Sequence, residues 1–159
     1  MIIFRPKGGL NVDFETIGCC GLFCESCDIY QSVQKGTLKN LAAKWDMSPE
    51  DLACDGCRSG RHGAQSSKCY IRKCCSEKGL EVCGRCEEFP CATLKKFNDH
   101  AAPHSVLAVS NCELFREVGL FEGYHILREK WSCTCGEVFS WYQSRCARCN
   151  EELANLLDV

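Results

Sequence analysis

The chain has 159 residues, of which 17 (about 11 %) are cysteine, a fraction typical of small scaffolds held together by cross-links or metal ions. Its formal net charge is −2, from 19 basic and 21 acidic residues, so no general attraction to polyanions is expected. No run of about 18 apolar residues is present, which excludes a helix that spans a membrane.

The chemistry of the cysteines depends on the compartment. The first ten residues contain no apolar stretch followed by a small-residue cleavage site, so we expect no signal peptide and a cytoplasmic location. Disulfides are rare in a reducing cytosol, where cysteine-rich spacing more often indicates metal binding or catalysis. The odd number of cysteines and the adjacent pairs Cys19-Cys20 and Cys74-Cys75 also argue against a disulfide framework.

The cysteines divide the chain into three parts. We predict a cysteine-rich segment over 15–91, a helical connector over 92–131 and a small C-terminal module over 131–150. The predicted fold class is a small, metal-stapled α+β protein, in which short helices surround metal-binding knuckles and a C-terminal β-hairpin forms a zinc ribbon.

Short helices are expected early in the chain. The stretch 28–35 predicts a helix that buries Ile29, Tyr30 and Val33, and Gly36-Thr37 predicts its end and the cap of a second helix. That second helix would bury the apolar residues recurring at helical spacing over 38–45. Ser48-Pro49-Glu50-Asp51 is a typical helix start, with a capping serine and proline at the first helical position.

The cysteine-rich segment contains three Cys-x2-Cys pairs, a pattern that indicates metal sites. The ten candidate ligands of this segment fall into three groups along the chain. The first group, of four cysteines close in sequence, could form a single metal site. The second group, of three cysteines, could take its fourth ligand from the last three cysteines. Because ten candidate ligands do not divide by four, either two remain unligated or an incomplete third site borrows His62, an aspartate or water. The first group is Cys54, Cys57, Cys69 and Cys74; the second is Cys20, Cys24 and Cys27; the last three are Cys83, Cys86 and Cys91. Cys19, Cys75 and Cys112 are left over, and we expect Cys112 to be a buried, inert thiol.

The sequence of the connector predicts two helices, each with a stripe of apolar residues at helical spacing. Ser105 is expected to cap a helix that buries Leu107, Leu114 and Val118 and that ends at Gly119. A second apolar stripe with spacing i, i+4, i+7, i+11 follows at Leu120, Tyr124, Leu127 and Trp131.

The C-terminal module gives the most specific pattern. Two tight cysteine pairs are separated by ten residues, as in zinc ribbons, where four thiolates surround one tetrahedral Zn²⁺. Gly136 and Asn150 follow the pairs at positions where a left-handed turn would expose backbone N–H groups to sulfur. Strand-forming residues over 138–142 would build the hairpin. The predicted ligands are Cys133, Cys135, Cys146 and Cys149.

Four segments together resemble one family. They are Cys20-Gly-Leu-Phe-Cys24-Glu-Ser-Cys27-Asp-Ile-Tyr30, Cys54-Asp-Gly-Cys57, Cys69-Tyr-Ile-Arg-Lys-Cys74 and the run from Cys83 to Phe97. This ordered series is similar to the cysteine-rich prokaryotic proteins grouped as domain of unknown function 3795. The resemblance covers nearly everything after residue 15 and implies zinc binding without an established activity. The family often has a cysteine where this chain has Ser66, so the site containing Cys69 is expected to be altered or incomplete.

Three functions remain after a disulfide oxidoreductase is set aside, since no βαβ context surrounds any Cys-x2-Cys pair. We favour zinc that holds the fold of a protein- or nucleic-acid-interaction module, without catalysis, because a filled four-thiolate site has no open coordination position. The alternative is an iron–sulfur redox protein that uses the Cys20/Cys24/Cys27 motif. Single-stranded nucleic acid could bind through the ribbon, where Arg145 and Arg148 lie near Trp141 and Tyr142.

Overall fold

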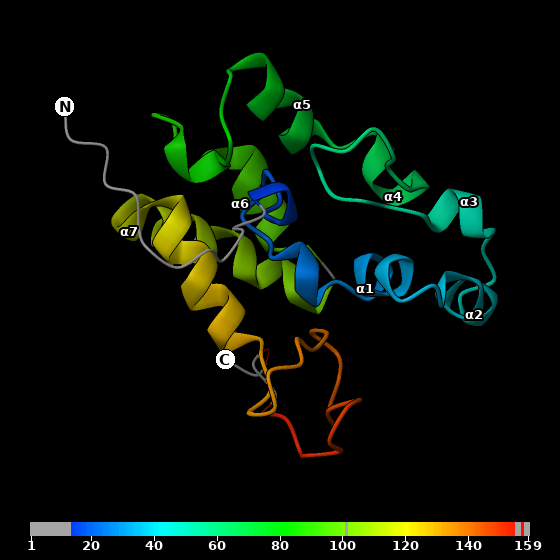
Figure 1. The fold of residues 1–159 in the computed structure, drawn as a ribbon. Coiled ribbons are helices and arrows are strands. Elements are labelled where there is room, and N and C mark those ends of the chain that lie inside the picture. The colour runs from blue at the N-terminus through cyan, green and yellow to red at the C-terminus, as the bar shows by residue number, and fades with distance from the viewer. Residues whose placement is uncertain (1–13, 101, 155–156, 158–159) are drawn as a thin grey trace.

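Short helices and one long helix make up the protein, as the computed structural model shows for residues 14–100, 102–154 and 157 (Figure 1). Short 3₁₀ turns interrupt the chain at η1 (Phe14–Thr16), η2 (Cys24–Ser26), η3 (Cys83–Arg85) and η4 (Pro103–Val106). The α-helices are α1 (Asp28–Gln34), α2 (Leu38–Lys44), α3 (Pro49–Leu52), α4 (Ala64–Ser67), α5 (Tyr70–Glu77), α6 (Ala92–Asn98) and α7 (Leu107–Lys130). No helix in the described ranges has both the length and the apolar character needed to cross a bilayer.

The predicted α+β class is wrong, since the described residues contain helices and isolated bridges but no strand. The expected β-hairpin over 138–142 is not formed, because its backbone donors are used elsewhere. The N–H of Phe139 donates to the carbonyl of Trp131 (2.9 Å) and that of Trp141 to the carbonyl of Ser26 (3.0 Å). A tight turn, in which the N–H of Gln143 donates to the carbonyl of Ser140 (3.0 Å), then reverses the chain.

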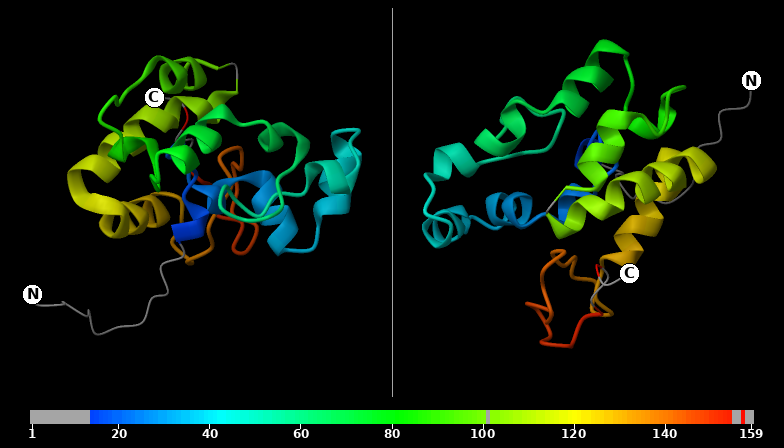
Figure 2. Two further views of the ribbon diagram at one scale, coloured as in Figure 1. Left: turned by 90° about the horizontal axis from the view of Figure 1, so that it is seen from above. Right: turned by 180° about the vertical axis from the view of Figure 1, so that it is seen from behind.

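The first helices begin and end close to their predicted positions but bury less than expected. Ser48 caps α3 as predicted, its hydroxyl accepting the N–H of Asp51 at 3.1 Å. No residue of α1 is fully buried, and in α2 only Ala42 is, while Trp45 is 38 % exposed. Helices α1 to α4 lie away from most of α7 (Figures 1 and 2), so their apolar faces have little core to pack against.

Helix α7 provides much of the core and breaks at Gly119, whose φ of 83° is not helical. The predicted second stripe is confirmed for Tyr124, Leu127 and Trp131, which are all buried. In the first half of the helix Leu107 is buried, but Val118 remains 37 % exposed, contrary to expectation.

Ser105 does not act as the predicted cap. It lies in η4, and its buried hydroxyl donates to backbone carbonyls of the preceding loop, at 2.8 Å for Ala102 and 3.0 Å for His100. The serine therefore closes the loop between α6 and α7.

The cysteine-rich segment packs directly on the first half of α7. Asn111 donates from its side-chain amide to the carbonyl of Gly21 (3.0 Å), and the thiol of Cys112 donates to the carbonyl of Cys20 (3.4 Å). Cys112 is completely buried, as predicted, and burial raises its pKa to about 12. One hydrophobic cluster extends from Ile17 to Cys146 and includes residues from all three predicted parts of the chain.

A polar cluster fastens η2 to the second half of α7. The carboxylate of Glu25 accepts hydrogen bonds from the hydroxyls of Thr16 (3.2 Å) and Tyr124 (2.7 Å) and from the guanidinium of Arg128. Burial and the neighbouring Glu25 carboxylate raise the pKa of Tyr124 to about 12.

Tyr124 is therefore expected to ionise later than an ordinary tyrosine, and Glu25→Gln is expected to lower its pKa. Because the pKa of Tyr124 is higher in the folded than in the unfolded protein, the protonated phenol stabilises the fold below about pH 10. This contribution to stability is lost as the pH rises toward 12. Alkaline titration of tyrosinate absorbance measures the effect, with Tyr70→Phe, which removes a tyrosine that is 78 % exposed, as the control. An unchanged high-pH step in Glu25→Gln contradicts the assignment.

Candidate metal centre

Two tight turns after α7 carry the last four cysteines. In the first, the N–H of Gly136 donates to the carbonyl of Cys133 (2.8 Å), and in the second the N–H of Asn150 donates to that of Cys146 (2.9 Å). Both turn residues have a positive φ, 85° for Gly136 and 61° for Asn150, which confirms the left-handed turns predicted from the sequence.

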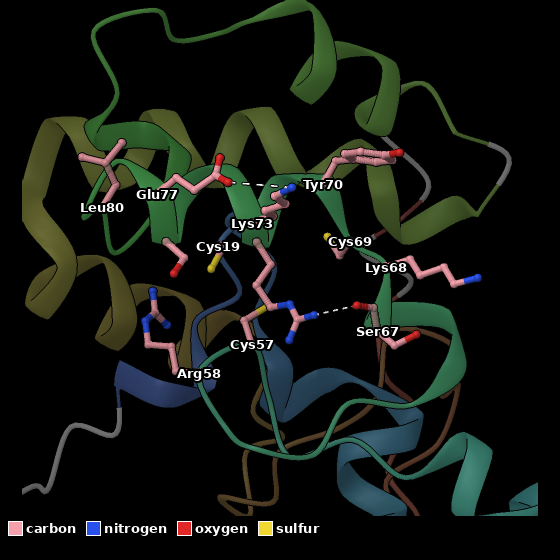
Figure 3. Close-up of a pocket in the computed structure, with 12 residues that line it drawn as sticks. Cys19, Cys57, Arg58, Ser67, Lys68, Cys69, Tyr70, Lys73, Glu77 and Leu80 are labelled. Atoms are coloured by element: carbon pink, nitrogen blue, oxygen red, sulfur yellow. Dashed lines mark hydrogen bonds and ion pairs between the residues drawn. The ribbon is translucent and has the colours of Figure 1, made fainter.

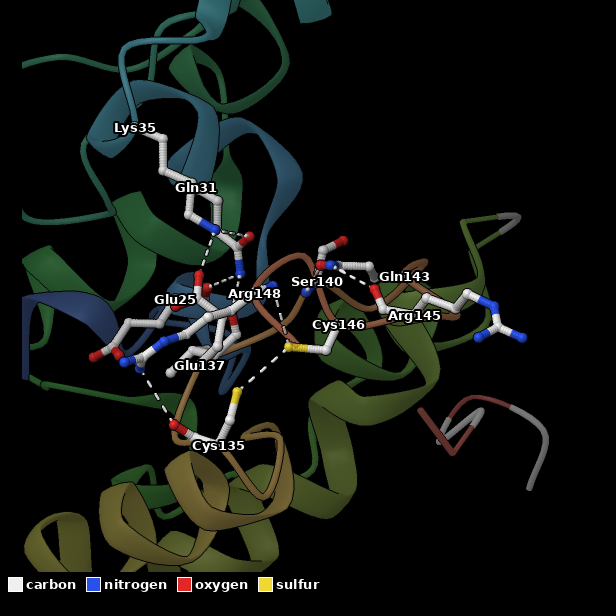
Figure 4. Close-up of polar contacts among 11 residues, drawn as sticks. Glu25, Gln31, Lys35, Cys135, Glu137, Ser140, Gln143, Arg145, Cys146 and Arg148 are labelled. Atoms are coloured by element: carbon white, nitrogen blue, oxygen red, sulfur yellow. Dashed lines mark hydrogen bonds and ion pairs between the residues drawn. The ribbon is translucent and has the colours of Figure 1, made fainter. Parts of the chain in front are cut away.

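The two turns face each other and bring the four sulfur atoms together. The Sγ atoms of Cys133 and Cys149 lie 3.5 Å apart, and those of Cys135 and Cys146 lie 3.6 Å apart (Figure 4). All four sulfurs lie within 4.8 Å of one another, so they can hold a metal ion. We call Cys133, Cys135, Cys146 and Cys149 the C-terminal thiol centre.

The backbone around this centre favours negative charge on one sulfur. The pKa of Cys146 is lowered to about 6, chiefly by the backbone N–H of Cys149 and also by that of Arg148, which lies 3.4 Å from the sulfur. The N–H of Glu151 acts in the same direction on Cys149, but hydrogen bonds with the neighbouring thiols prevail and raise the pKa of Cys149 to about 12. Without a cation the four thiols therefore do not all ionise together, and a bound cation would displace their protons.

The C-terminal thiol centre is fixed to the rest of the protein on two sides. On one side the rings of Trp131 and Phe139, both buried, meet edge to face at 5.6 Å. On the other side the Glu137 carboxylate pairs with Lys35, the residue that follows α1, at 2.9 Å (Figure 4), and the Ser140 hydroxyl donates to Asp28 of α1.

Most of the side chains suggested to bind nucleic acid instead make contacts within the protein. Trp141 is 6 % exposed and stacks on the imidazole of His104, with the ring centres 4.5 Å apart. The guanidinium groups of Arg145 and Arg148 donate to the backbone carbonyls of Asn150 (3.2 Å) and Cys135 (3.3 Å). Tyr142 is half exposed, but its hydroxyl lies 2.5 Å from Nδ1 of His104. The aromatic pair therefore belongs to the packing of the module and does not form a stacking platform.

The ten predicted ligands of the cysteine-rich segment are spread over several elements. Within the described residues, the C-terminal thiol centre is the one set of three or more cysteine, histidine or acidic ligand atoms that lie within 4.8 Å of one another. Among these earlier cysteines, Cys24 begins η2, Cys83 begins η3 and Cys74 lies inside α5, whereas the others lie in the loops and turns between the helices. They are Cys20, Cys24, Cys27, Cys54, Cys57, Cys69, Cys74, Cys83, Cys86 and Cys91.

Burial and mutual proximity disfavour ionisation of the first three of these thiols. Burial is the largest cause that raises the pKa of Cys20 and Cys24, and charge repulsion from neighbouring cysteines adds to it. Burial also raises the pKa of Cys27 to about 11. Of the other candidates, Cys54 has its sulfur 3.7 Å from the hydroxyl of Ser66.

One cysteine that the sequence left without a role has a sulfur neighbour. The sulfur of Cys75 lies 3.6 Å from that of Cys83, and the thiol of Cys75 donates to the backbone carbonyl of Cys19 at 3.8 Å. Spacing along the sequence contains no signal for this contact, because Cys75 lies in α5 and Cys83 begins η3.

Comparison with known proteins gives one family. The model of the family described as "Protein of unknown function (DUF3795)" matches residues 16–96, about half of the chain. No curated protein and no solved structure matches the chain.

Proposed function

The chain belongs to the DUF3795 family, and we propose that its C-terminal thiol centre holds one structural Zn²⁺ ion in a module that binds another macromolecule. The observation that carries this proposal is the approach of four sulfurs to within 4.8 Å of one another. Four cysteine sulfurs are a tetrahedral donor set typical of structural zinc, and soft thiolates disfavour Mg²⁺ and Ca²⁺.

A structural role fits the surroundings of the centre. The segment after α7 has no regular element within its described residues, so its own backbone provides little cooperative stability. A structural zinc site contributes about 10 kcal/mol or more to folding, which is enough to fix such a segment. With four protein ligands the ion has no free position for water or substrate, so this centre would not be catalytic.

The role of a binding module is supported by apolar side chains on the second half of α7. Phe121 is 47 % exposed and Ile126 is 37 % exposed, although the same helix buries Tyr124 and Leu127. Partly exposed aromatic and aliphatic side chains are the groups on which protein partners are usually anchored. A protein partner therefore fits this surface better than single-stranded nucleic acid, for which the buried Trp141 offers no base-stacking face.

Chelation tests the structural role directly. Removal of the metal from the full chain by a strong chelator is expected to abolish the near-ultraviolet circular dichroism of buried Trp131 and Trp141, and added Zn²⁺ is expected to restore it. Unchanged tryptophan signals in a demonstrably metal-free protein contradict a structural metal.

An iron–sulfur cluster in the cysteine-rich segment is the second candidate. Cys20, Cys24 and Cys27 are all partly buried, yet no three ligand atoms of this segment come within 4.8 Å of one another among the described residues. A cluster of several iron ions separates its thiolates more widely than a single ion does, so a wider separation is compatible with it. Anaerobic purification is the test, since a brown protein containing iron supports the cluster and a colourless, iron-free protein contradicts it.

A further inference from the structure

An open cavity of about 820 Å³ lies beside α5 and is lined by residues between Cys19 and Leu80, so it is separate from the C-terminal thiol centre. Its volume is that of a site for a small organic molecule, about 300–1,000 Å³, and exceeds what a single ion needs. Four cations and one carboxylate line it (Figure 3), although the whole chain has a net charge of −2. The charged residues are Arg58, Lys68, Arg72, Lys73 and Glu77.

Backbone carbonyls hold the two arginines of the cavity in place. The guanidinium of Arg58 donates to the carbonyls of Phe14 (3.0 Å) and Ile17 (2.6 Å). That of Arg72, which is half-buried, donates to the carbonyl of Ser67 (2.8 Å). A carbonyl carries no net charge, so these bonds orient the cations without neutralising them. Because a guanidinium has five N–H groups, Arg72 retains donors for a ligand.

The carboxylate in the cavity compensates little of this charge. Within the described part of the chain, the lining cations form one ion pair, between Lys73 and Glu77, with a long N–O distance of 3.8 Å. Both side chains are well exposed, at 70 % and 65 %, and such pairs are weak. The cavity is therefore expected to attract anions, and its arginines suit phosphate oxygens in particular, which accept two parallel hydrogen bonds from a guanidinium.

An exposed aromatic ring lies at the edge of the same cavity. Tyr70, the first residue of α5, lines the cavity and is 78 % exposed. Figure 3 shows Tyr70 and Lys68 on one side of the opening and Arg58 on the opposite side. An accessible aromatic face stacks well on a planar nucleic-acid base, whatever the identity of that base. The cavity thus combines a stacking surface with phosphate-binding cations.

We propose that this cavity binds a free nucleotide, whose base stacks on Tyr70 and whose phosphates are held by Arg72 and the neighbouring cations. Neither half of such a ligand is sufficient alone, because inorganic phosphate leaves the aromatic face unused and a nucleoside has no charge for the cations to bind. This site lies outside the C-terminal thiol centre and needs no metal there. The cysteines that line the cavity take no part in binding.

Isothermal titration calorimetry of the full-length, metal-loaded protein at low salt is the test. The probes are ADP, GDP, CDP and UDP, with adenosine and inorganic pyrophosphate as the two halves of the ligand. At least one diphosphate is expected to bind ten times more tightly than either half. Pyrophosphate that binds as tightly as the best nucleotide overturns the nucleotide assignment, and so does the absence of binding by all four.

The stacking surface is tested with two substitutions of Tyr70, an exposed residue whose side chain the fold does not need. Tyr70→Ala is expected to weaken binding of the best nucleotide at least about fivefold and to leave pyrophosphate binding within about twofold. Tyr70→Phe keeps the aromatic face and is expected to bind both ligands as the wild type does. Equal losses for nucleotide and pyrophosphate in Tyr70→Ala overturn stacking on this residue.

The cations are tested with Lys68→Gln/Lys73→Gln, which is expected to weaken nucleotide binding roughly tenfold at low salt and less at high salt. Lys95→Gln/Lys96→Gln is the matched control, because it removes the same charge from exposed positions of α6 outside the cavity. Its affinity is expected to stay within about twofold of the wild type. Equal losses in the two double variants overturn a local site. A single-stranded oligonucleotide that displaces the nucleotide at a tenfold lower concentration overturns a free nucleotide as the occupant.

Discussion

Cys149→Ser is expected to destabilise the protein by at least about 3 kcal/mol, although Cys149 is an exposed residue. Replacing an exposed side chain that has no special role usually changes stability by less than about 0.5 kcal/mol. The larger loss is expected because the sulfur of Cys149, 3.5 Å from that of Cys133, would supply one of four metal ligands. Denaturant unfolding of the metal-loaded protein, followed by the fluorescence of the buried tryptophans, measures the change.

Two matched variants identify the cause of this loss. Cys149→His is expected to recover most of the stability, because three cysteines and one histidine form another common structural zinc site. Ser144→Ala, at an exposed position in the same segment, is expected to have no measurable effect. A Cys149→Ser protein as stable as the Ser144→Ala protein contradicts a metal at this centre.

Gly21→Ala is expected to cost roughly 3 kcal/mol or more, through two additive causes. Gly21 has a φ of 90°, which an L-residue with a Cβ adopts only under strain. An added Cβ would also lie 2.7 Å from the sulfur of Cys112 and 2.9 Å from the carbonyl oxygen of Ala108. Because both contacts belong to α7, the substitution is expected to separate this helix from the cysteine-rich segment, as measured by thermal or denaturant unfolding.

Gly60→Ala is the control for this effect. A Cβ at Gly60 meets nothing within 4 Å and needs no left-handed backbone, so its expected change in stability is less than about 1 kcal/mol. If the two alanine variants unfold at the same denaturant concentration, the close packing of Gly21 on α7 is wrong.

Local patterns predicted those features of the fold that depend on neighbours in sequence. The cap at Ser48 depends on an N–H three residues away, and the turns at Gly136 and Asn150 depend on adjacent backbone. The grouping of the four C-terminal cysteines was predictable for the same reason, since each pair lies within one turn. In the second half of α7, Tyr124 and Leu127 follow helical spacing onto a single buried face.

Features that depend on distant packing were not predictable in this way. The aromatic residues after Cys135 have high strand propensity, but Trp141 donates its N–H to Ser26, more than a hundred residues earlier, instead of to a neighbouring strand. The periodicity predicted more buried side chains in α1 and α2 than the structure has. The apolar residues of these helices lie away from most of α7, where there is little hydrophobic core to cover them.

The contacts of the remaining thiols could not be obtained from spacing either. Adjacent side chains in a chain point in different directions, so the side chain of Cys19 is buried while that of Cys20 stays partly exposed. The same holds for Cys75 beside Cys74, since successive residues on α5 face different sides of the helix. The sequence therefore identified the cysteine-rich segment but could not assign its sulfur partners.

Metal content by native mass spectrometry is the most direct measurement of the proposed centre. Wild-type protein and Cys149→Ser are purified without added metal and compared as folded, full-length chains. The wild type is expected to carry bound zinc, and the variant to carry one zinc ion fewer per chain. Equal metal content in the two proteins, or a wild type without zinc, contradicts the account.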